Sequence, residues 1–118
     1  MLLAALVACG GGYDCVEVPA SCTPEFEPTF DAMYANTFTT CALSAPCHGQ
    51  GSANGLDLGP DADSAYEALL GHDYVVPGEP GCGEVSIRLG SGEMPPGAPL
   101  SEAELCAVRT WIADGAER

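Results

Sequence analysis

The chain has 118 residues, enough for one domain, with three Arg, no Lys and seventeen acidic residues, so its formal net charge is −14. Such a charge repels nucleic acid and anionic lipid surfaces and argues against nucleic-acid binding. The acidic residues are scattered and 47% of the residues are hydrophobic, which indicates a folded domain with an acidic surface rather than a disordered tail.

The N-terminus has the pattern of a lipoprotein signal peptide. Leu2 to Ala8 is apolar but far below the roughly 20 residues needed to span a bilayer, so no transmembrane helix is predicted here. Residues 6–9 (LVAC) match the lipobox, where a protease cuts before a cysteine that carries a diacylglycerol. We predict a signal peptide at 1–8 and lipidation of Cys9, which places the protein in the cell envelope, facing the periplasm or at the surface. No Lys or Arg precedes the run, which leaves open a start further upstream or an ordinary apolar N-terminus with a chance cysteine.

Residues 9–28 are expected to be a lipid-anchored flexible tether, and 29–118 a single domain. Three consecutive Gly open the segment, and Pro19, Pro24 and Pro28 follow with little apolar periodicity. Export places the thiols in an oxidising compartment, where they pair. If Cys9 carries lipid, six cysteines remain, with fifteen possible full pairings. Locality favours pairing Cys15 with Cys22 and Cys82 with Cys106.

Two helices are predicted in the first half of the domain. Thr29 is a suitable N-cap for a helix that carries Phe30, Tyr34 and Phe38 on one face and ends near Cys41. A Gly/Pro-rich loop follows between residues 45 and 60. The second helix is expected over residues 61–71, capped by an aspartate at 61 or 63 and terminated by a glycine.

The second half predicts one ambiguous element and one clear helix. Residues 85–89 alternate in hydropathy over a length that fits a strand or a turn of helix equally well. Ser101 with Glu104 forms a capping box, and Leu105, Val108 and Trp111 begin an apolar stripe that ends near residue 115. The fold class is therefore all-α, with three to four short helices joined by long Gly/Pro-rich loops. Loops this long in a small domain usually wrap something.

Several motifs after residue 46 belong together. Cys47 and His48 form the C-terminal half of a CxxCH haem-attachment signature. Residues 93–101 (EMPPGAPLS) follow downstream, preceded by VPGEP at 76–80 and followed by WI at 111–112 and GA at 115–116. With these motifs the chain resembles, from about Phe30 to Ala116, the single-haem c-type cytochrome domain of exported bacterial proteins.

The resemblance implies a small cytochrome c-like domain with covalent haem c, whose iron lies between His48 and Met94. It implies electron transfer with redox partner proteins, with no catalysis and no small-molecule substrate. Two prolines after Met94 stiffen its loop, which limits the entropy lost when sulfur binds a metal, and His/Met ligation raises the reduction potential of haem. The alternative for Met94 is a side chain that fills a gap in the core. The acidic surface would suit a basic patch on the redox partner.

The attachment motif departs from the family pattern. Position 44 is Ser44, and the nearest upstream thiol is Cys41, with five residues between it and Cys47. Haem held by Cys47 alone would leave one thiol unpaired in an oxidising compartment, so Cys41 and Cys47 either both hold haem or neither does. The leading hypothesis is haem on Cys41 and Cys47.

The alternative hypothesis is a haem-free lipoprotein module with three disulfides, including Cys41 with Cys47, that binds a partner or supports envelope structure. A zinc site of Cys and His is less favoured, because export favours pairing of the thiols. His72 follows a glycine that ends a helix, so we expect it to face solvent.

Overall fold

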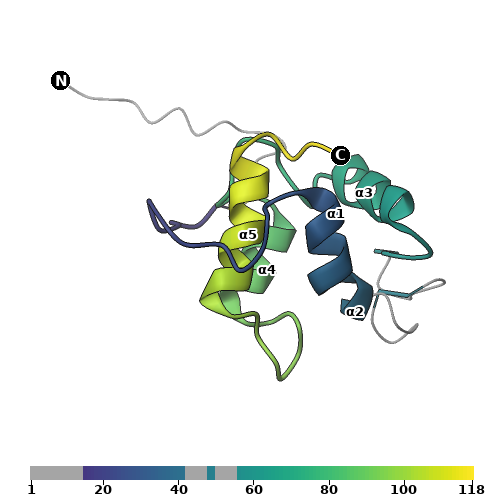
Figure 1. Ribbon diagram of the computed structural model, residues 1–118, viewed down its shortest axis with the longest axis horizontal. Helices are drawn as coiled ribbons and strands as arrows, with labels where there is room; N and C mark the ends of the chain where they lie inside the picture. Colours follow the sequence, from purple (N-terminus) through teal and green to yellow (C-terminus); the bar gives the residue numbers. More distant parts are fainter. Residues whose placement is uncertain (1–14, 42–47, 50–55) are drawn as a thin grey trace.

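The computed structural model describes residues 15–41, 48–49 and 56–118, and these residues form a set of short helices around one core (Figure 1). The first helical stretch consists of α1 (Phe30–Met33), a π-helical turn η1 (Tyr34–Phe38) and α2 (Thr39–Cys41), which follow one another without a break. Further along the chain lie α3 (Ala62–Gly71), α4 (Glu84–Ser91) and α5 (Glu102–Ala113).

The first helical stretch begins as its sequence predicts. The hydroxyl of Thr29 accepts a hydrogen bond from the backbone N–H of Ala32 at 3.3 Å, so the predicted N-cap is confirmed. Phe30 and Phe38 are buried, in agreement with the predicted apolar face. The π-helical turn was not expected from the sequence; such turns are rare and add a residue to the helical ladder, which changes the direction of the side chains that follow.

The three later helices have well-defined starts and ends. Asp61 caps α3 by accepting from the N–H of Ser64 at 2.9 Å, and His72, just after α3, is exposed as predicted. Residues 85–89 form part of α4, which resolves the ambiguity between strand and helix. Ser101 caps α5 by accepting from the N–H of Glu104 at 3.1 Å.

The described residues contain helices and one isolated β-bridge between Cys15 and Cys82, and no strand, which confirms the predicted all-α class for this part of the chain. The cytochrome c-like arrangement itself stays a prediction. Within the described ranges, every helix is too short or too polar to cross a bilayer.

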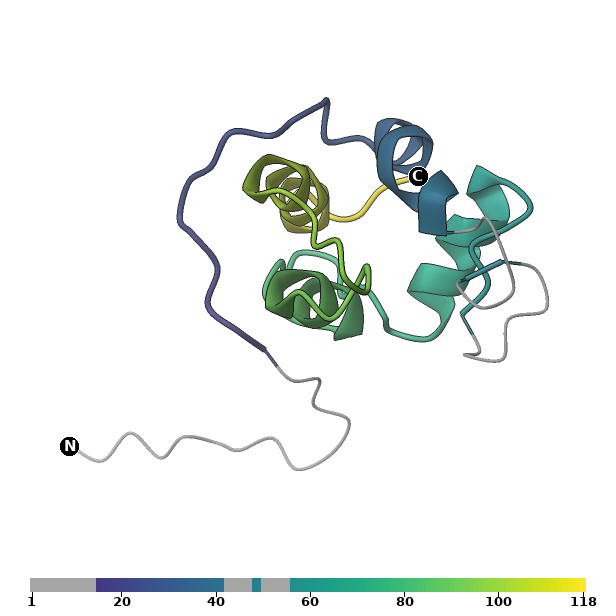
Figure 2. The same cartoon turned by 90° about the horizontal axis from the view of Figure 1, so that it is seen from below.

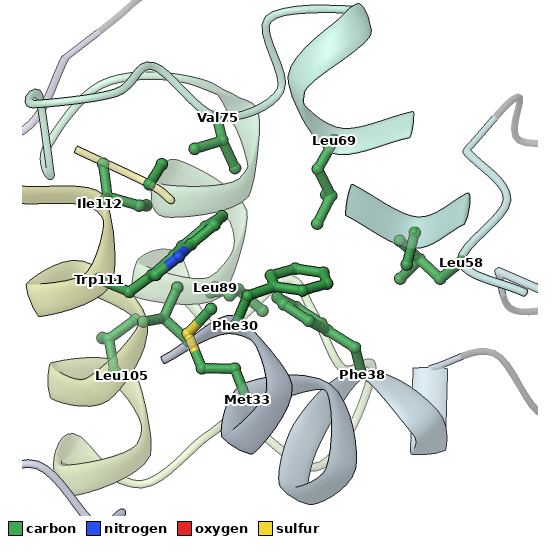
Figure 3. Close-up of a cluster of buried hydrophobic side chains, with 13 residues drawn as sticks. Phe30, Met33, Phe38, Leu58, Leu69, Val75, Leu89, Leu105, Trp111 and Ile112 are labelled. Carbon is green, nitrogen blue, oxygen red and sulfur yellow. The ribbon is translucent and has the colours of Figure 1, made fainter. Parts of the chain in front are cut away.

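The core lies where the first helical stretch, α3, α4 and α5 meet (Figure 3). The ring of Phe30 is its centre: its centroid lies 5.3 Å from that of Tyr66, 5.4 Å from Trp111 and 6.2 Å from Phe38. Both Trp111 and Tyr66 also satisfy their polar atoms, because the indole N–H donates to Glu117 O at 2.7 Å and the phenol donates to Ala116 O at 2.8 Å. The last residues of the chain are thereby fixed against the core.

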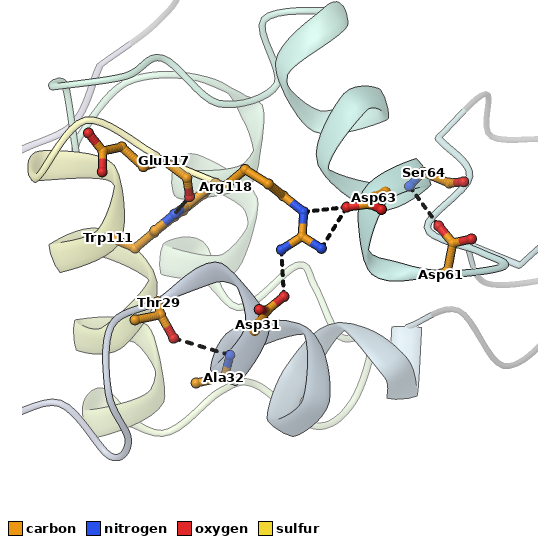
Figure 4. Close-up of polar contacts among 9 residues, drawn as sticks. All are labelled: Thr29, Asp31, Ala32, Asp61, Asp63, Ser64, Trp111, Glu117 and Arg118. Carbon is orange, nitrogen blue, oxygen red and sulfur yellow. Dashed lines mark hydrogen bonds and ion pairs between the residues drawn. The ribbon is translucent and has the colours of Figure 1, made fainter.

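The C-terminal Arg118 links two helices at the surface (Figure 4). Its guanidinium donates to Asp63 of α3 at 2.6 Å and to Asp31 of α1. It also lies over the ring of Phe30, with Cζ 5.4 Å from the ring centroid. These hydrogen bonds raise the pKa of Arg118 above its ordinary value, the bond to Asp31 contributing most.

The segment before α1 follows an arc past α4 and α5 (Figure 2). Cys15 forms a disulfide with Cys82, and Cys22 forms a second one with Cys106. Between these cross-links and α1, Glu25 donates its backbone N–H to the carbonyl of Ala103 at 3.0 Å. From Cys15 onward, the segment expected to be a tether is therefore bonded to the domain at several points.

The disulfide pairing predicted from locality, Cys15 with Cys22 and Cys82 with Cys106, is wrong. Because the segment runs along the domain, it carries Cys15 to the loop before α4 and Cys22 to the side of α5. Proximity in sequence says little about proximity in space for a segment of this kind. The two disulfides indicate an oxidising compartment outside the cytoplasm.

Candidate functional site

A mainly apolar cavity of about 320 Å³ lies between the first helical stretch, α3, α4 and the loop that carries Met94. Its lining comes from several separate segments of the chain. These are Phe38, Cys41, His48, Leu56, Leu58, Leu69, Tyr74, Glu84, Val85, Arg88, Leu89, Met94, Pro95 and Pro96.

His48 is held in the cavity wall by backbone hydrogen bonds. Its Nδ1 lies 2.9 Å from the carbonyl oxygen of Leu56, so the tautomer protonated at Nδ1 donates there and leaves Nε2 as the acceptor. Its own N–H donates to Cys41 O at 2.8 Å, and its carbonyl accepts from the N–H of Leu58 at 2.8 Å. The side chain is half-buried.

Met94 faces the same cavity from the loop after α4. Its backbone N–H donates to the carbonyl of Arg88 at 3.2 Å, which fastens the loop to the end of the helix. The side chain is partly buried and packs against the core, so it also serves the gap-filling role considered from the sequence. Pro95 and Pro96 follow it along the cavity wall.

The charged residues of the cavity lie on one turn of α4. Arg88 Nε lies 3.5 Å from Glu84, and its Nη1 donates to Glu93 at 3.2 Å. All three side chains are about half exposed or more, so these ion pairs contribute little to stability. They form a polar edge on an otherwise apolar site.

Three of the five predicted site residues come together in this cavity: Cys41, His48 and Met94. The other two, Cys47 and Cys9, lie outside the described residues, so the structure tests neither the predicted haem attachment nor the predicted lipidation.

Haem-based electron transfer, predicted from the resemblance, is wrong. Over residues 15–41, 48–49 and 56–118, no three side chains of the His, Cys, Asp and Glu type form a group able to hold a metal ion. Four of the described cysteines are engaged in the two disulfides. The disulfide-stabilised alternative therefore agrees better with the structure than haem-based electron transfer does.

Several cavity residues were not singled out from the sequence. Leu56 and Leu58 lie in a loop whose Gly and Pro content marks irregular structure and hides apolar positions that point inward. Glu84 and Arg88 have the i, i+4 spacing of a helical ion pair, a signal that depends on residues 84–91 being helical.

Comparisons with known proteins find no relative: no family model, no curated protein and no solved structure matches the chain.

Proposed function

We propose that this protein is a haem-free, disulfide-stabilised binding module of the cell envelope, which holds a small and mainly apolar molecule in the cavity beside His48 and Met94. It binds this molecule without converting it. The observation that carries the proposal is the cavity itself. Its volume of about 320 Å³ lies at the lower end of the range of about 300–1,000 Å³ usual for small-molecule sites, and most of its lining is aliphatic or aromatic.

The polar groups of the cavity suit orientation of a ligand rather than catalysis. Nε2 of His48 and the hydroxyl of Tyr74 offer hydrogen bonds, while Arg88 is engaged by Glu84 and Glu93. The thiol of Cys41, which also lines the cavity, donates a hydrogen bond to the carbonyl of Thr37 at 3.7 Å. The similarity of the Met94 segment to cytochrome c domains then reflects the fold and not the cofactor.

The test is binding of a neutral apolar probe, N-phenyl-1-naphthylamine, whose fluorescence rises in an apolar site. We expect saturable binding to the oxidised protein. Val85→Trp, which fills the cavity from α4, should abolish it, and Pro96→Trp at the cavity wall should weaken it. The matched control is Ile87→Trp, which adds the same side chain to the same helix at a position outside the lining and should leave binding intact.

Two results would overturn the proposal. Equal affinity in Val85→Trp, Pro96→Trp and the native protein would place the probe elsewhere. A haem-sized covalent mass on protein expressed with a haem-maturation system would show that the module is not haem-free.

The proposal includes a lipid anchor at Cys9, supported by the LVAC pattern and by disulfides that require an oxidising compartment. Labelled palmitate should be incorporated into the protein in a bacterial host, and Cys9→Ser should abolish incorporation. Labelling that persists in Cys9→Ser would contradict the anchor at this position.

A further inference from the structure

A second cavity, of about 490 Å³, lies between the N-terminal segment and α5. The N-terminal segment runs past α5 (Figure 2). Its residues 18–22 form one wall of the cavity, and the Cys22–Cys106 disulfide fixes this wall to the helix. The other wall is a face of α5, and its charged residues are Glu102 and Arg109. This cavity shares no lining residue with the one beside His48.

Arg109 differs from the other two cations of the chain. Arg88 is paired with Glu84 and Glu93, and Arg118 with Asp31 and Asp63. For Arg109, the described residues provide neither an ion pair nor a hydrogen bond, and its Nε is buried without a partner. A buried donor without an acceptor is unfavourable, which makes this guanidinium the natural place for an anion to bind.

The guanidinium of Arg109 packs closely against α4. Its Nη2 lies so close to Gly90 of α4 that a side chain at position 90 would clash with it. Burial lowers the pKa of Arg109, and the charge of Glu102 acts in the opposite direction. Because the ordinary pKa of arginine is so high, the group keeps its charge at neutral pH.

The walls around Arg109 combine apolar carbon with two hydroxyls. Val18, Pro19, Leu105 and Ala113 supply the apolar part, and Ser21 and Thr110 supply the hydroxyls. Inorganic phosphate would leave the apolar walls uncovered, whereas a carboxylate with a hydrocarbon chain would contact both parts of the cavity.

We propose that this second cavity binds an organic carboxylate, whose oxygens accept hydrogen bonds from the Arg109 guanidinium while its hydrocarbon part packs on the apolar walls. Glu102, at the edge of the same cavity, repels the carboxylate and limits the affinity.

The experiment follows the Nε–H resonance of Arg109 by NMR in protein labelled with ¹⁵N-arginine. Hexanoate, acetate and inorganic phosphate are titrated separately at constant ionic strength. We expect saturation by hexanoate at lower concentration than by acetate, since its chain reaches the apolar walls, and weaker binding of phosphate. Phosphate binding as tight as hexanoate binding would overturn the assignment to an organic carboxylate.

Three variants test the roles of the charged residues. For each variant, hexanoate binding is followed by the NMR chemical shifts of the backbone amides in residues 18–22. Arg109→Gln should weaken hexanoate binding by about tenfold or more. The control Arg118→Gln removes the same charge outside both cavities and should leave binding unchanged. Glu102→Gln, at an exposed position, should tighten it. Unchanged binding in Arg109→Gln, or weaker binding in Glu102→Gln, would overturn the proposal. Because the two cavities are separate, the apolar probe of the first cavity should not compete with hexanoate.

Discussion

Cys22 and Cys106 are 84 residues apart in sequence and joined by a disulfide that fastens the N-terminal segment to α5. The Cys15–Cys82 disulfide closes a second loop, of 67 residues, and the two loops overlap for most of their length. A domain of this size buries a limited share of its surface, so cross-links of this kind supplement its packing.

The pairing can be checked by peptide mapping without reduction. Cleavage after glutamate separates all four cysteines, because Glu17, Glu25 and Glu84 lie between them. We expect the peptide ending at Glu17 linked to residues 68–84, because the bond between Glu79 and Pro80 resists cleavage, and residues 18–25 linked to residues 105–117. A link between the first peptide and residues 18–25 would contradict the structure.

Loss of the Cys22–Cys106 disulfide should destabilise the domain substantially. A cross-link that closes a long loop stabilises a protein by about 2–4 kcal/mol, chiefly by restricting the unfolded chain. The double variant Cys22→Ser/Cys106→Ser should therefore unfold at a clearly lower urea concentration. Cys15→Ser/Cys82→Ser serves as the comparison and should show a loss of similar size. A loss below about 0.5 kcal/mol in either variant would show that the corresponding loop is not constrained by its disulfide.

Phe30 should be among the least replaceable residues of the core. It is 1% exposed and contacts aromatic rings from three helical elements. We expect Phe30→Ala to lower the free energy of unfolding by about 3–5 kcal/mol, and Phe30→Leu to lower it less. The control is Val16→Ala, at a residue that is 44% exposed, where a change within about 0.5 kcal/mol is expected. Urea denaturation measures all three, and equal losses in Phe30→Ala and Val16→Ala would contradict the central position of Phe30 in the core.

The helices could be predicted from the sequence because their signals are local. Thr29 and Ser101 cap the helices that they were predicted to begin, and Asp61 is the one of two predicted aspartates that caps α3. Residues 85–89 stayed ambiguous because a five-residue alternation fits strand and helix equally well, and tertiary contacts with α5 decide the outcome.

The disulfide pairing and the cavities could not be predicted, because they depend on contacts between distant segments. The arc of residues 15–28 follows from where α4 and α5 lie, and no local pattern encodes it. Likewise, His48 and Met94 were singled out from a family resemblance, whereas the apolar surroundings that they share come from Leu58, Leu69 and Leu89 on three other segments.

The N-cap of α3 should make the stability of the protein depend on pH in the acidic range. The N–H of Ser64 donates to the Asp61 carboxylate, with a further contribution from the Ser64 side chain, and this lowers the pKa of Asp61 below its ordinary value. Because the folded pKa is the lower one, ionised Asp61 favours the folded state. Its contribution is complete above the ordinary pKa and is lost as the pH falls through the folded value.

Asp61→Asn keeps a capping side chain that does not titrate. The difference in Tm between the native protein and Asp61→Asn should therefore be constant from pH 7 to about pH 5. Between about pH 4 and pH 2, the Tm of the native protein should fall relative to that of Asp61→Asn. Asp61→Ala, which removes the cap, should lower Tm at neutral pH by more than Asp61→Asn does. Thermal unfolding followed by circular dichroism measures these differences, and a native-minus-Asn difference that does not change with pH would show that the Asp61 carboxylate is not coupled to folding.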